Sequence, residues 1–442
     1  MIIVDTALKK LAQENKPIRV GLVGSGFMGR AVGRQIIKYN PGIRLVGVSN
    51  RRLEKIEQLY KEAGITEYKV VDSPTELENA ISTGVYAATE DAMLLCRSGQ
   101  VDLIFEVTGN VEFGARVAME AIKNGKHILT VNAELGGTLG PILKLYADKA
   151  GVIYSDADGD QPGVQMNLYR FVRQIGLRPV VCGNIKGLQD YYRNPTTQAE
   201  FAKKWEQSPE MVTSFADGTK ISFEQCVVAN ATGMKVAKRG MHGFALKPGT
   251  HFEESAKMFL SDELLKGPGI VDYLVGASPS PGVFVFATTD DPIEKKFLDL
   301  YKLGEGPLYP FYTPYHLCYF EAPASIARVA LFNDPVITPQ SGPVVEVIAL
   351  AKKDMKAGEG LDRLGGYTMY GVCENTSTAR EENLLPVGLA GGCALKRNVA
   401  KDEAIKISDV EFPKDRLCDK LWQEQNKKFT KYEIVRMYEN DK

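Results

Sequence analysis

The sequence predicts an α/β protein that begins with a doubly wound parallel sheet covered by helices on both faces. Two observations support this fold class. Short apolar runs alternate with amphipathic stretches between residues 18 and 154, which is the order that parallel strands and crossover helices produce. The first apolar run also leads directly into a glycine-rich turn and then into a helical pattern.

The glycine-rich turn follows a predicted strand over residues 18–23. Gly24, Gly26 and Gly29 have the spacing G-x-G-x-x-G, and a helical pattern opens at Ala31. Gly24 would allow a tight turn, Gly26 a close approach to a ligand, and Gly29 close packing of helix on strand. Free N–H groups at a helix start attract anions, so the turn predicts a site for a dinucleotide pyrophosphate. The same predicted site includes Phe27 and Met28. A glycine-rich turn of another kind of α/β protein is the alternative.

The end of the second predicted strand, residues 44–49, indicates which dinucleotide binds. NAD enzymes usually have an acidic residue here, which holds the ribose 2′-hydroxyl. This chain has Asn50, Arg51 and Arg52, and the first acid is Glu54. Because guanidinium groups bind phosphate bidentately, we predict NADP and consider NAD less favoured. The alternative is that both arginines are solvated residues at a helix start.

Polar residues follow two later strands of the predicted sheet. Thr108 and Gly109 end one strand, and Asn132 and Glu134 follow another. The carboxyl ends of such strands form the ligand crevice, so we expect these four residues beside the nicotinamide half of the cofactor. The remaining strands are predicted at 101–108, 127–132 and 152–154, and the helices at 6–14, 53–63, 75–82, 90–96, 111–124 and 139–150.

Composition excludes several classes of function. The chain has 442 residues, 44% of them hydrophobic, and a net charge of −1, so it has no electrostatic character that favours nucleic acid or a membrane surface. It lacks an apolar run near 18 residues long and a basic-then-apolar leader. Its seven scattered cysteines predict reduced thiols. We therefore expect a cytoplasmic protein whose partner is a small-molecule substrate.

The alternating pattern ends at an acidic loop, Asp156-Ala-Asp-Gly-Asp-Gln-Pro-Gly163. A metal site is one interpretation, but an acidic turn with a helix cap is favoured, and no metal site is predicted. We place the boundary of the dinucleotide-binding domain here, with domain 1 over residues 1–158. An α+β substrate domain rich in Tyr, Pro and Gly is predicted over residues 159–345.

Three residues are candidates for catalysis. Hydride transfer to a carbonyl needs an acid that protonates the developing alkoxide. Lys186 ends an apolar strand predicted over 180–186, where burial would shift its pKa towards neutrality. His242 is flanked by glycines, and Asp160 is expected to orient Lys186 or to hold substrate hydroxyls. The alternatives are a surface lysine, a structural histidine and a helix cap.

The last part of the chain contains a weak internal repeat. Residues 349–361 and 394–405 share Ala-Leu, a basic residue and Glu-x-aliphatic at similar offsets. The repeat predicts a separately folded β-rich unit over 346–412. A charged tail over 413–442 follows, with a helix predicted at 417–426.

These parts resemble a known family. The first 150 residues resemble the NADP-binding half of homoserine dehydrogenases, and residues 346–412 resemble an SAF domain, a β-clip unit. Their order is similar to that of the deoxyxylulose-phosphate-reductoisomerase-like enzymes, with three segments between them: Gly240-Met-His-Gly243, Gly282-Val-Phe-Val285 and Pro314-Tyr-His-Leu317. The resemblance implies conversion of 1-deoxyxylulose 5-phosphate to 2-C-methylerythritol 4-phosphate with NADPH. Ala133 replaces the lysine of the homoserine dehydrogenase segment Thr-Ala-Asn-Lys, which argues against homoserine as substrate.

We therefore expect an NADP-dependent oxidoreductase that acts on a small hydroxylated carbonyl compound, sugar-like and phosphorylated compounds included. By analogy with the family it would be a homodimer or another homo-oligomer. A reductoisomerase would be a different enzyme with the same cofactor, and it would need a divalent metal, held by Asp160 with Asp156 or Asp158. The sequence is also compatible with a non-catalytic NADP-binding sensor, and with a lyase or epimerase that uses bound nicotinamide transiently.

Overall fold

The computed structural model describes residues 2–429, which form two compact units. Unit 1 comprises residues 2–160, 317–338 and 420–424, and unit 2 comprises residues 161–316, 339–419 and 425–429. The first boundary lies two residues from the one predicted at residue 158. The predicted β-rich part, 346–412, lies within unit 2.

Unit 1 contains the predicted parallel sheet. Its strands are β1 (Ile18–Val23), β2 (Ile43–Ser49), β3 (Tyr68–Val70), β4 (Tyr86–Thr89), β5 (Leu103–Glu106), β6 (His127–Thr130) and β7 (Tyr154–Asp156). They lie in the order β3-β4-β2-β1-β5-β6-β7, and every pair is parallel. The α/β class is therefore confirmed. The sequence interpretation missed β3 and β4, which are too short to show a period.

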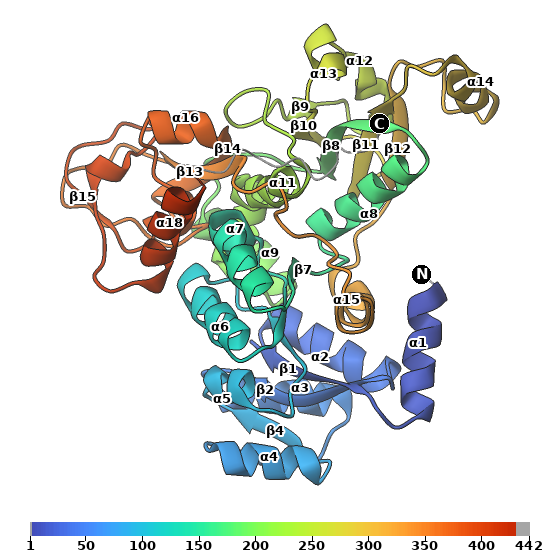
Figure 1. The fold of residues 1–442 in the computed structure, drawn as a ribbon. Coiled ribbons are helices and arrows are strands. Elements are labelled where there is room, and N and C mark those ends of the chain that lie inside the picture. Colours follow the sequence, from blue (N-terminus) through green and yellow to red (C-terminus); the bar gives the residue numbers. More distant parts are fainter. Residues whose placement is uncertain (1, 430–442) are drawn as a thin grey trace. The chain divides into compact units, whose positions relative to one another are not determined.

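Helices cover both faces of this sheet (Figure 1). One face carries α1 (Ile2–Gln13), α2 (Phe27–Tyr39), α3 (Leu53–Ala63) and α15 (Cys318–Phe332), and the other carries α4 (Pro74–Ser82), α5 (Ala92–Arg97), α6 (Val111–Lys123) and α7 (Ala133–Lys149). Helix α15 comes from far along the chain, yet its Ala322, Ile326 and Ala327 are fully buried in the same core cluster as Val20 and Leu22. The unit is thus completed by a late segment of the chain.

Two helices of unit 1 begin earlier than predicted. Helix α2 starts at Phe27 and not at Ala31, directly after the glycine turn. Helix α7 starts at Ala133 and not at residue 139, because the side chain of Asn132 accepts the Leu135 N–H and caps the first turn. Helical periodicity is hard to recognise in these first turns, which contain glycine or small residues.

Unit 2 is built on a mixed sheet. Its strands are β8 (Arg178–Lys186), β9 (Phe244–Ala245), β10 (Ile270–Val275), β11 (Gly282–Thr288) and β12 (Tyr309–Thr313), in the order β12-β11-β8-β10-β9. One face is covered by α8 (Gln161–Gln174) and α11 (Thr219–Thr232). The other face packs an aromatic cluster whose large members are Phe252, Phe259, Phe284 and Phe286. These rings lie on η1 (Phe252–Ser255), α12 (Ala256–Phe259) and β11.

Helix α11 is central to unit 2. We predicted a mixture of strand and helix over residues 220–230, and this was wrong, since the segment is helical throughout. The helix packs against β8 and β10, and also against the hairpin of β13 (Val345–Ala351) and β14 (Met369–Asn375). Because it is buried on all sides, its sequence has no polar face.

The remaining elements of unit 2 are short. They are α9 (Pro195–Lys204), α10 (Pro209–Ala216), α13 (Asp262–Lys266), α14 (Pro292–Leu300), α16 (Thr376–Glu381), α17 (Val387–Ala390), β15 (Ala394–Leu395), η2 (Ile407–Asp409) and β16 (Val410–Glu411). Helix α18 (Leu417–Lys428) follows them. The two copies of the repeat pair antiparallel through isolated bridges, such as Met355 with Val399 and Gly360 with Ala394.

All seven cysteines are free thiols. Among residues 2–429, no helix has the length and apolar character needed to cross a membrane.

Candidate functional site

The glycine turn has the geometry that its spacing predicts. Gly24 has φ of +104°, a conformation that favours glycine. A β carbon on Gly29 would lie 2.0 Å from the carbonyl oxygen of Gly24, so only glycine fits there. A β carbon on Gly26 would meet nothing within 4 Å. The turn therefore leaves open space at the start of α2, where backbone N–H groups can receive a phosphate.

The strands of unit 1 end in one row, which we call the carboxyl edge. The paired residues of this row are Thr89, Ser49, Val23, Glu106, Thr130 and Asp156. Asn50, Gly24, Thr108 and Asn132 each follow a member of the row by one or two residues. The structure thus brings residues from four predicted segments of the cofactor site to a single edge of the sheet, where such folds bind ligands.

Glu106 connects several of these residues, and the sequence analysis missed it. One carboxylate oxygen accepts the Thr108 N–H at 2.7 Å and the Thr108 hydroxyl. The other accepts Asn132 Nδ2 at 2.9 Å and the Thr130 hydroxyl at 3.2 Å. Burial raises the pKa of Glu106, and these hydrogen bonds oppose the rise. An acid at the end of an apolar strand was the available signal.

The two arginines proposed to select the cofactor are both exposed. Asn50 Oδ1 accepts the Arg52 N–H at 3.1 Å, and Arg52 Nε lies 3.7 Å from Glu54 Oε1. An exposed ion pair of this length contributes little, so Arg52 is available to a ligand. Of the other predicted cofactor residues, Phe27 is exposed, Met28 is half-buried, Gly109 has φ of +63°, and Glu134 is buried in the first turn of α7.

The acidic loop is tied to α15 within unit 1. Asp158 Oδ2 lies 3.9 Å from Arg328 Nη1. Burial, together with the nearby charge of Asp158, raises the pKa of Glu321 to about 7. The Cys318 thiol donates to Asp160 Oδ1 at 3.7 Å. Helix α15 was not predicted as a partner, because its contacts with the loop join residues far apart in sequence. Within the described ranges, no three His, Cys, Asp or Glu side chains gather as metal ligands.

Lys186 lies at the end of β8 in unit 2. Its ammonium donates to Gln189 Oε1 at 2.7 Å and to the Phe215 carbonyl at 2.9 Å, and it lies 5.8 Å from the centre of the Tyr273 ring. An ammonium has three N–H groups, and the third has no partner in the part of the chain that the structure describes. One donor is therefore left for a ligand.

Burial lowers the pKa of Lys186 to about 8, although the carboxylates of Glu224 and Asp217 oppose this shift. Asp217 is itself buried and lies 2.8 Å from the ammonium of Lys352. Asn184 Nδ2 donates to Glu224 Oε2 at 3.3 Å, while the Asn184 Oδ1 atom has no hydrogen-bond partner within residues 2–429. Buried ionisable groups with shifted pKa values gather at functional sites, so this cluster is the strongest candidate in unit 2.

His242 forms a second arrangement in unit 2. Its Nδ1 lies 2.7 Å from Oδ2 of the fully buried Asp272, which also accepts the backbone N–H groups of His242 and Gly243. The imidazole stacks on Phe244, with ring centres 4.8 Å apart. Because the carboxylate accepts from Nδ1, Nε2 is the ring nitrogen available to a ligand. Asp272 was not predicted, since it lies inside an apolar strand.

Lys186 and His242 lie on opposite faces of the unit 2 sheet. Side chains of a strand alternate between the two faces of a sheet, so Asn184 and Lys186 of β8 lie on the same face, together with Tyr273, which pairs with Asn184. Asp272 pairs with Gly183 and therefore lies on the other face, which carries the aromatic cluster. His242 packs against Phe259 of this cluster. The structure therefore does not bring together Lys186 and His242, the two candidates for the acid–base and carbonyl-polarising roles.

Two family models match successive parts of the chain. Residues 18–130 match the oxidoreductase family with an NAD-binding Rossmann fold, and residues 159–322 match the catalytic domain of oxidoreductase DRL. The first match covers the glycine turn and most of the carboxyl edge. The second covers Asp160, Lys186 and His242.

Homoserine dehydrogenases are similar over a short part of the chain. That of Methylobacillus glycogenes is 30% identical over 122 residues, which is 27% of this chain and 26% of the relative. That of Bacillus subtilis is 29% identical over 143 residues, which is 32% of this chain and 30% of the relative. The matched part thus spans less than a third of these curated relatives.

Solved structures give a weaker likeness. A scyllo-inositol dehydrogenase from Lactobacillus casei, solved with NAD(H) and scyllo-inositol, is 12% identical with a TM-score of 0.42, over 74% of this chain and 92% of that one. A probable dehydrogenase from Thermotoga maritima is 13% identical with a TM-score of 0.40, over 72% and 90%. The two family models, matched in succession, support an NAD(P)-dependent oxidoreductase.

Proposed function

We propose that the chain is an NADP-dependent oxidoreductase of a small hydroxylated carbonyl compound, with Lys186 as the proton donor. The observation that carries this proposal is the environment of Lys186, a buried ammonium with a pKa near 8 and one N–H group left for a ligand. A general acid is most effective when its pKa lies near the working pH.

The cofactor would be held by unit 1. The glycine turn would receive the pyrophosphate, and Arg51 and Arg52 would bind the 2′-phosphate. Glu106 would hold Thr108 and Asn132 in place at the carboxyl edge. When bound, the nicotinamide ring donates or accepts the hydride.

The substrate would be held by unit 2. Lys186 would donate its third N–H to the carbonyl oxygen, protonate the alkoxide in reduction and accept the proton in oxidation. The Oδ1 atom of Asn184, which has no hydrogen-bond partner within residues 2–429, would accept a hydrogen bond from a substrate hydroxyl, and this supports a hydroxylated compound. Asp160 and His242 remain proposals for substrate binding and for a second acid–base step.

The test of the proposal is a fluorescence titration of NADPH and NADH against the full chain and an Arg51→Ala, Arg52→Ala variant. We expect wild type to prefer NADPH, and the variant to bind NADPH at least tenfold more weakly with NADH binding unchanged. An Arg97→Ala, Arg116→Ala variant removes the same charge from exposed positions on α5 and α6 and should bind as wild type. Equal or tighter binding of NADH by wild type would contradict the assignment of NADP.

A further inference from the structure

Helix α14 leaves an apolar face exposed on unit 2. The segment between β11 and β12 carries this helix away from the sheet (Figure 1), and none of its nine residues is buried. Its large apolar side chains are 50–72% exposed, and we call them the α14 stripe: Ile293, Phe297, Leu300 and the following Tyr301. At 3.6 residues per turn they share an arc of about 100° of the helix surface. The stripe is therefore one continuous apolar face.

Local signals start α14, but packing within the described chain does not cover it. The side chain of Asp291 accepts the Ile293 N–H at 2.7 Å and caps the first turn, and Pro292 occupies the first helical position. Isolated helices shorter than about 12 residues are marginal in water, and most helices owe their stability to an apolar face that is packed. An uncovered apolar face on so short a helix indicates that another surface covers it.

The charges around the α14 stripe favour a protein surface over a lipid surface. Residues 290–302 contain four acidic residues and three lysines, so their net charge is −1. Helices that lie on anionic membranes usually carry an excess of Lys and Arg on the polar face. The balanced charge of this segment gives no such attraction.

The α14 stripe is symmetric about Phe297. Ile293 lies four residues before Phe297, and Tyr301 lies four residues after it. If two copies of the helix pack antiparallel around a two-fold axis at Phe297, Ile293 of each copy lies opposite Tyr301 of the other. The stripe is therefore self-complementary in length and position.

The charges beside the stripe are also self-complementary. The exposed residues Lys296 and Asp299 lie on the same side of the stripe, by their helical spacing. In an antiparallel pair with two-fold symmetry, the same side of each helix meets the same side of the other, and residues before the axis face residues after it. Lys296 of each copy would therefore lie beside Asp299 of the other.

The α14 stripe is large enough for a reversible dimer. An aromatic side chain buries about 150–250 Å² when it is covered, so the exposed parts of the four side chains offer roughly 100 Å² each. Two copies would bury about 800 Å² from the stripe alone, and flanking side chains add to this. Because specific interfaces below about 1,200 Å² are at the weak end of their class, we expect a dimer that dissociates on dilution.

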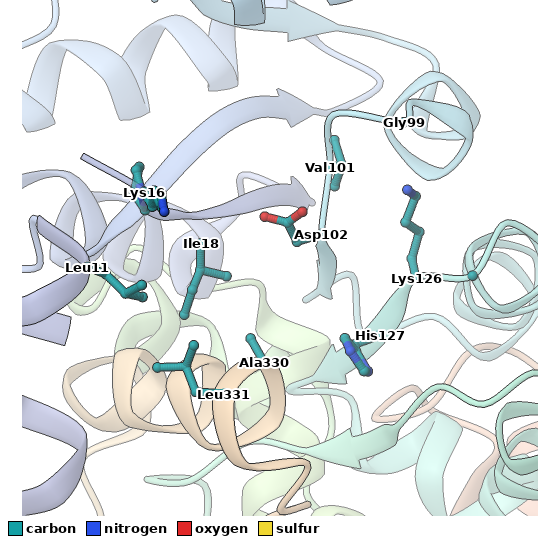
Figure 2. A pocket seen from close by; sticks show the side chains of 12 residues that line it. Leu11, Lys16, Ile18, Gly99, Val101, Asp102, Lys126, His127, Ala330 and Leu331 are labelled. Atoms are coloured by element: carbon teal, nitrogen blue, oxygen red, sulfur yellow. The ribbon is translucent and has the colours of Figure 1, made fainter. Parts of the chain in front are cut away.

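The pocket of unit 1 offers no comparable binding surface. It lies where β1, β5 and β6 begin, and Lys126 and His127 extend from its wall in different directions (Figure 2). Successive residues point to opposite faces of a sheet. The carboxylate of Asp102 is already paired with Arg19 at 2.7 Å. The polar groups of this pocket therefore do not converge on one ligand.

We infer that two copies of this chain associate through α14, with the two helices antiparallel about a two-fold axis at Phe297. The apolar stripes would cover each other, and Lys296 of each copy would pair with Asp299 of the other. The inference does not depend on the proposed function, because α14 carries no residue assigned to the cofactor or to the substrate.

The test is sedimentation velocity of the full chain at loading concentrations of about 1–200 μM. We expect a reversible association of two copies in wild type. Phe297→Asp should weaken it at least tenfold, because this variant places two carboxylates at the axis. Since no residue of α14 is buried, the variant should fold, and circular dichroism verifies this. Phe201→Asp is the matched control: Phe201 is 55% exposed on α9, so its variant should associate as wild type.

Two charge variants test the antiparallel geometry at low ionic strength. Lys296→Glu and Asp299→Lys should each weaken association at least threefold, because each puts like charges together at both symmetric contacts. An equimolar mixture of the two variants should recover it, since both contacts in the mixed pair join opposite charges.

Three outcomes would overturn the inference. A wild type that stays monomeric over the whole range would leave the α14 stripe to another kind of protein. Association of Phe297→Asp as tight as that of wild type would place the contact elsewhere on the chain. A mixture of the charge variants that associates no better than its components would contradict the antiparallel pair.

Discussion

Gly26 and Gly29 lie three residues apart in one turn and would respond differently to the same added methyl group. Gly26 has φ of −70°, which any residue adopts, and open space at its β position. Gly29 faces the carbonyl oxygen of Gly24. Gly26 therefore leaves space for a ligand, whereas Gly29 is required by the packing of the turn itself.

We therefore predict different effects of Gly26→Ala and Gly29→Ala on stability and on NADPH binding. Gly26→Ala should change the free energy of unfolding by less than about 1 kcal/mol but weaken NADPH binding at least tenfold, because the methyl group takes space needed by phosphate. Gly29→Ala should lower the free energy of unfolding by about 1–3 kcal/mol, as overpacking does. Urea unfolding and a fluorescence titration measure the two effects. Unchanged NADPH binding in Gly26→Ala would contradict the pyrophosphate site.

The pKa of Lys186 predicts how kcat depends on pH. With a folded pKa of about 8, its protonated fraction falls as the pH rises through 8. In reduction kcat should therefore fall over that range, and in oxidation it should rise. Lys186→Met should lower kcat by about 10²–10⁴-fold and remove this pH dependence. Lys186→Arg keeps the charge at every accessible pH, so it should flatten the profile as well. A pH profile that persists in Lys186→Met would exclude Lys186 as the acid.

At the scale of elements, periodicity predicts a segment well when one of its faces meets solvent. The predicted bounds of α3 match the structure, because that helix has a buried stripe and a polar face. The prediction of mixed strand and helix for the α11 segment was wrong, because this helix lies between a sheet and a hairpin and has no polar face. The partners of Lys186 and His242 could not be predicted, because Glu224 and Asp272 lie in other elements and only tertiary packing brings them close.

A buried ion pair fixes the start of α11 to the segment after β13. The ammonium of Lys352 donates to Asp217 Oδ2, to the Arg193 carbonyl and to the Gly366 carbonyl, at 2.7–2.8 Å. Lys352→Met should lower the free energy of unfolding by about 3–5 kcal/mol, because it leaves a buried carboxylate without its partner.

The second half of this test is the double variant Lys352→Met, Asp217→Leu. It removes both charges, so it should recover part of the loss in urea unfolding. An additive effect of the two changes would contradict coupling between these side chains.

At the scale of the whole molecule, buried carboxyl groups set how stability depends on pH. Burial raises the pKa of Glu346 to about 7 from the ordinary value of 4.5, with Arg380 opposing the rise. Between pH 4.5 and 7 the folded chain holds this proton and the unfolded chain does not. By linkage, stability must then fall as the pH rises through this window and level off above 7. Glu321, with a pKa of about 7, acts in the same direction.

Glu346→Gln should therefore make the chain more stable at pH 7.5 and reduce the slope of stability against pH between 5 and 7. Thermal midpoints across that range measure both effects. Glu374→Gln is the matched control, because Glu374 lies directly opposite on β14 but contacts Arg239 at 2.7 Å. It should not reduce the slope. An unchanged slope in Glu346→Gln would show that this carboxyl is ionised throughout.

Unit 1 is discontinuous, and this has a consequence for biosynthesis. Its core needs Ala322, Ile326 and Ala327 of α15, which the ribosome makes only after the large insertion that begins at residue 161. At roughly 5–20 residues per second, an interval of about 10–30 s separates residue 160 from the end of α15. During that interval the face of the sheet that α15 later covers is exposed on the nascent chain. A chaperone that binds apolar surface would find its target there, and would lose it once α15 has been made.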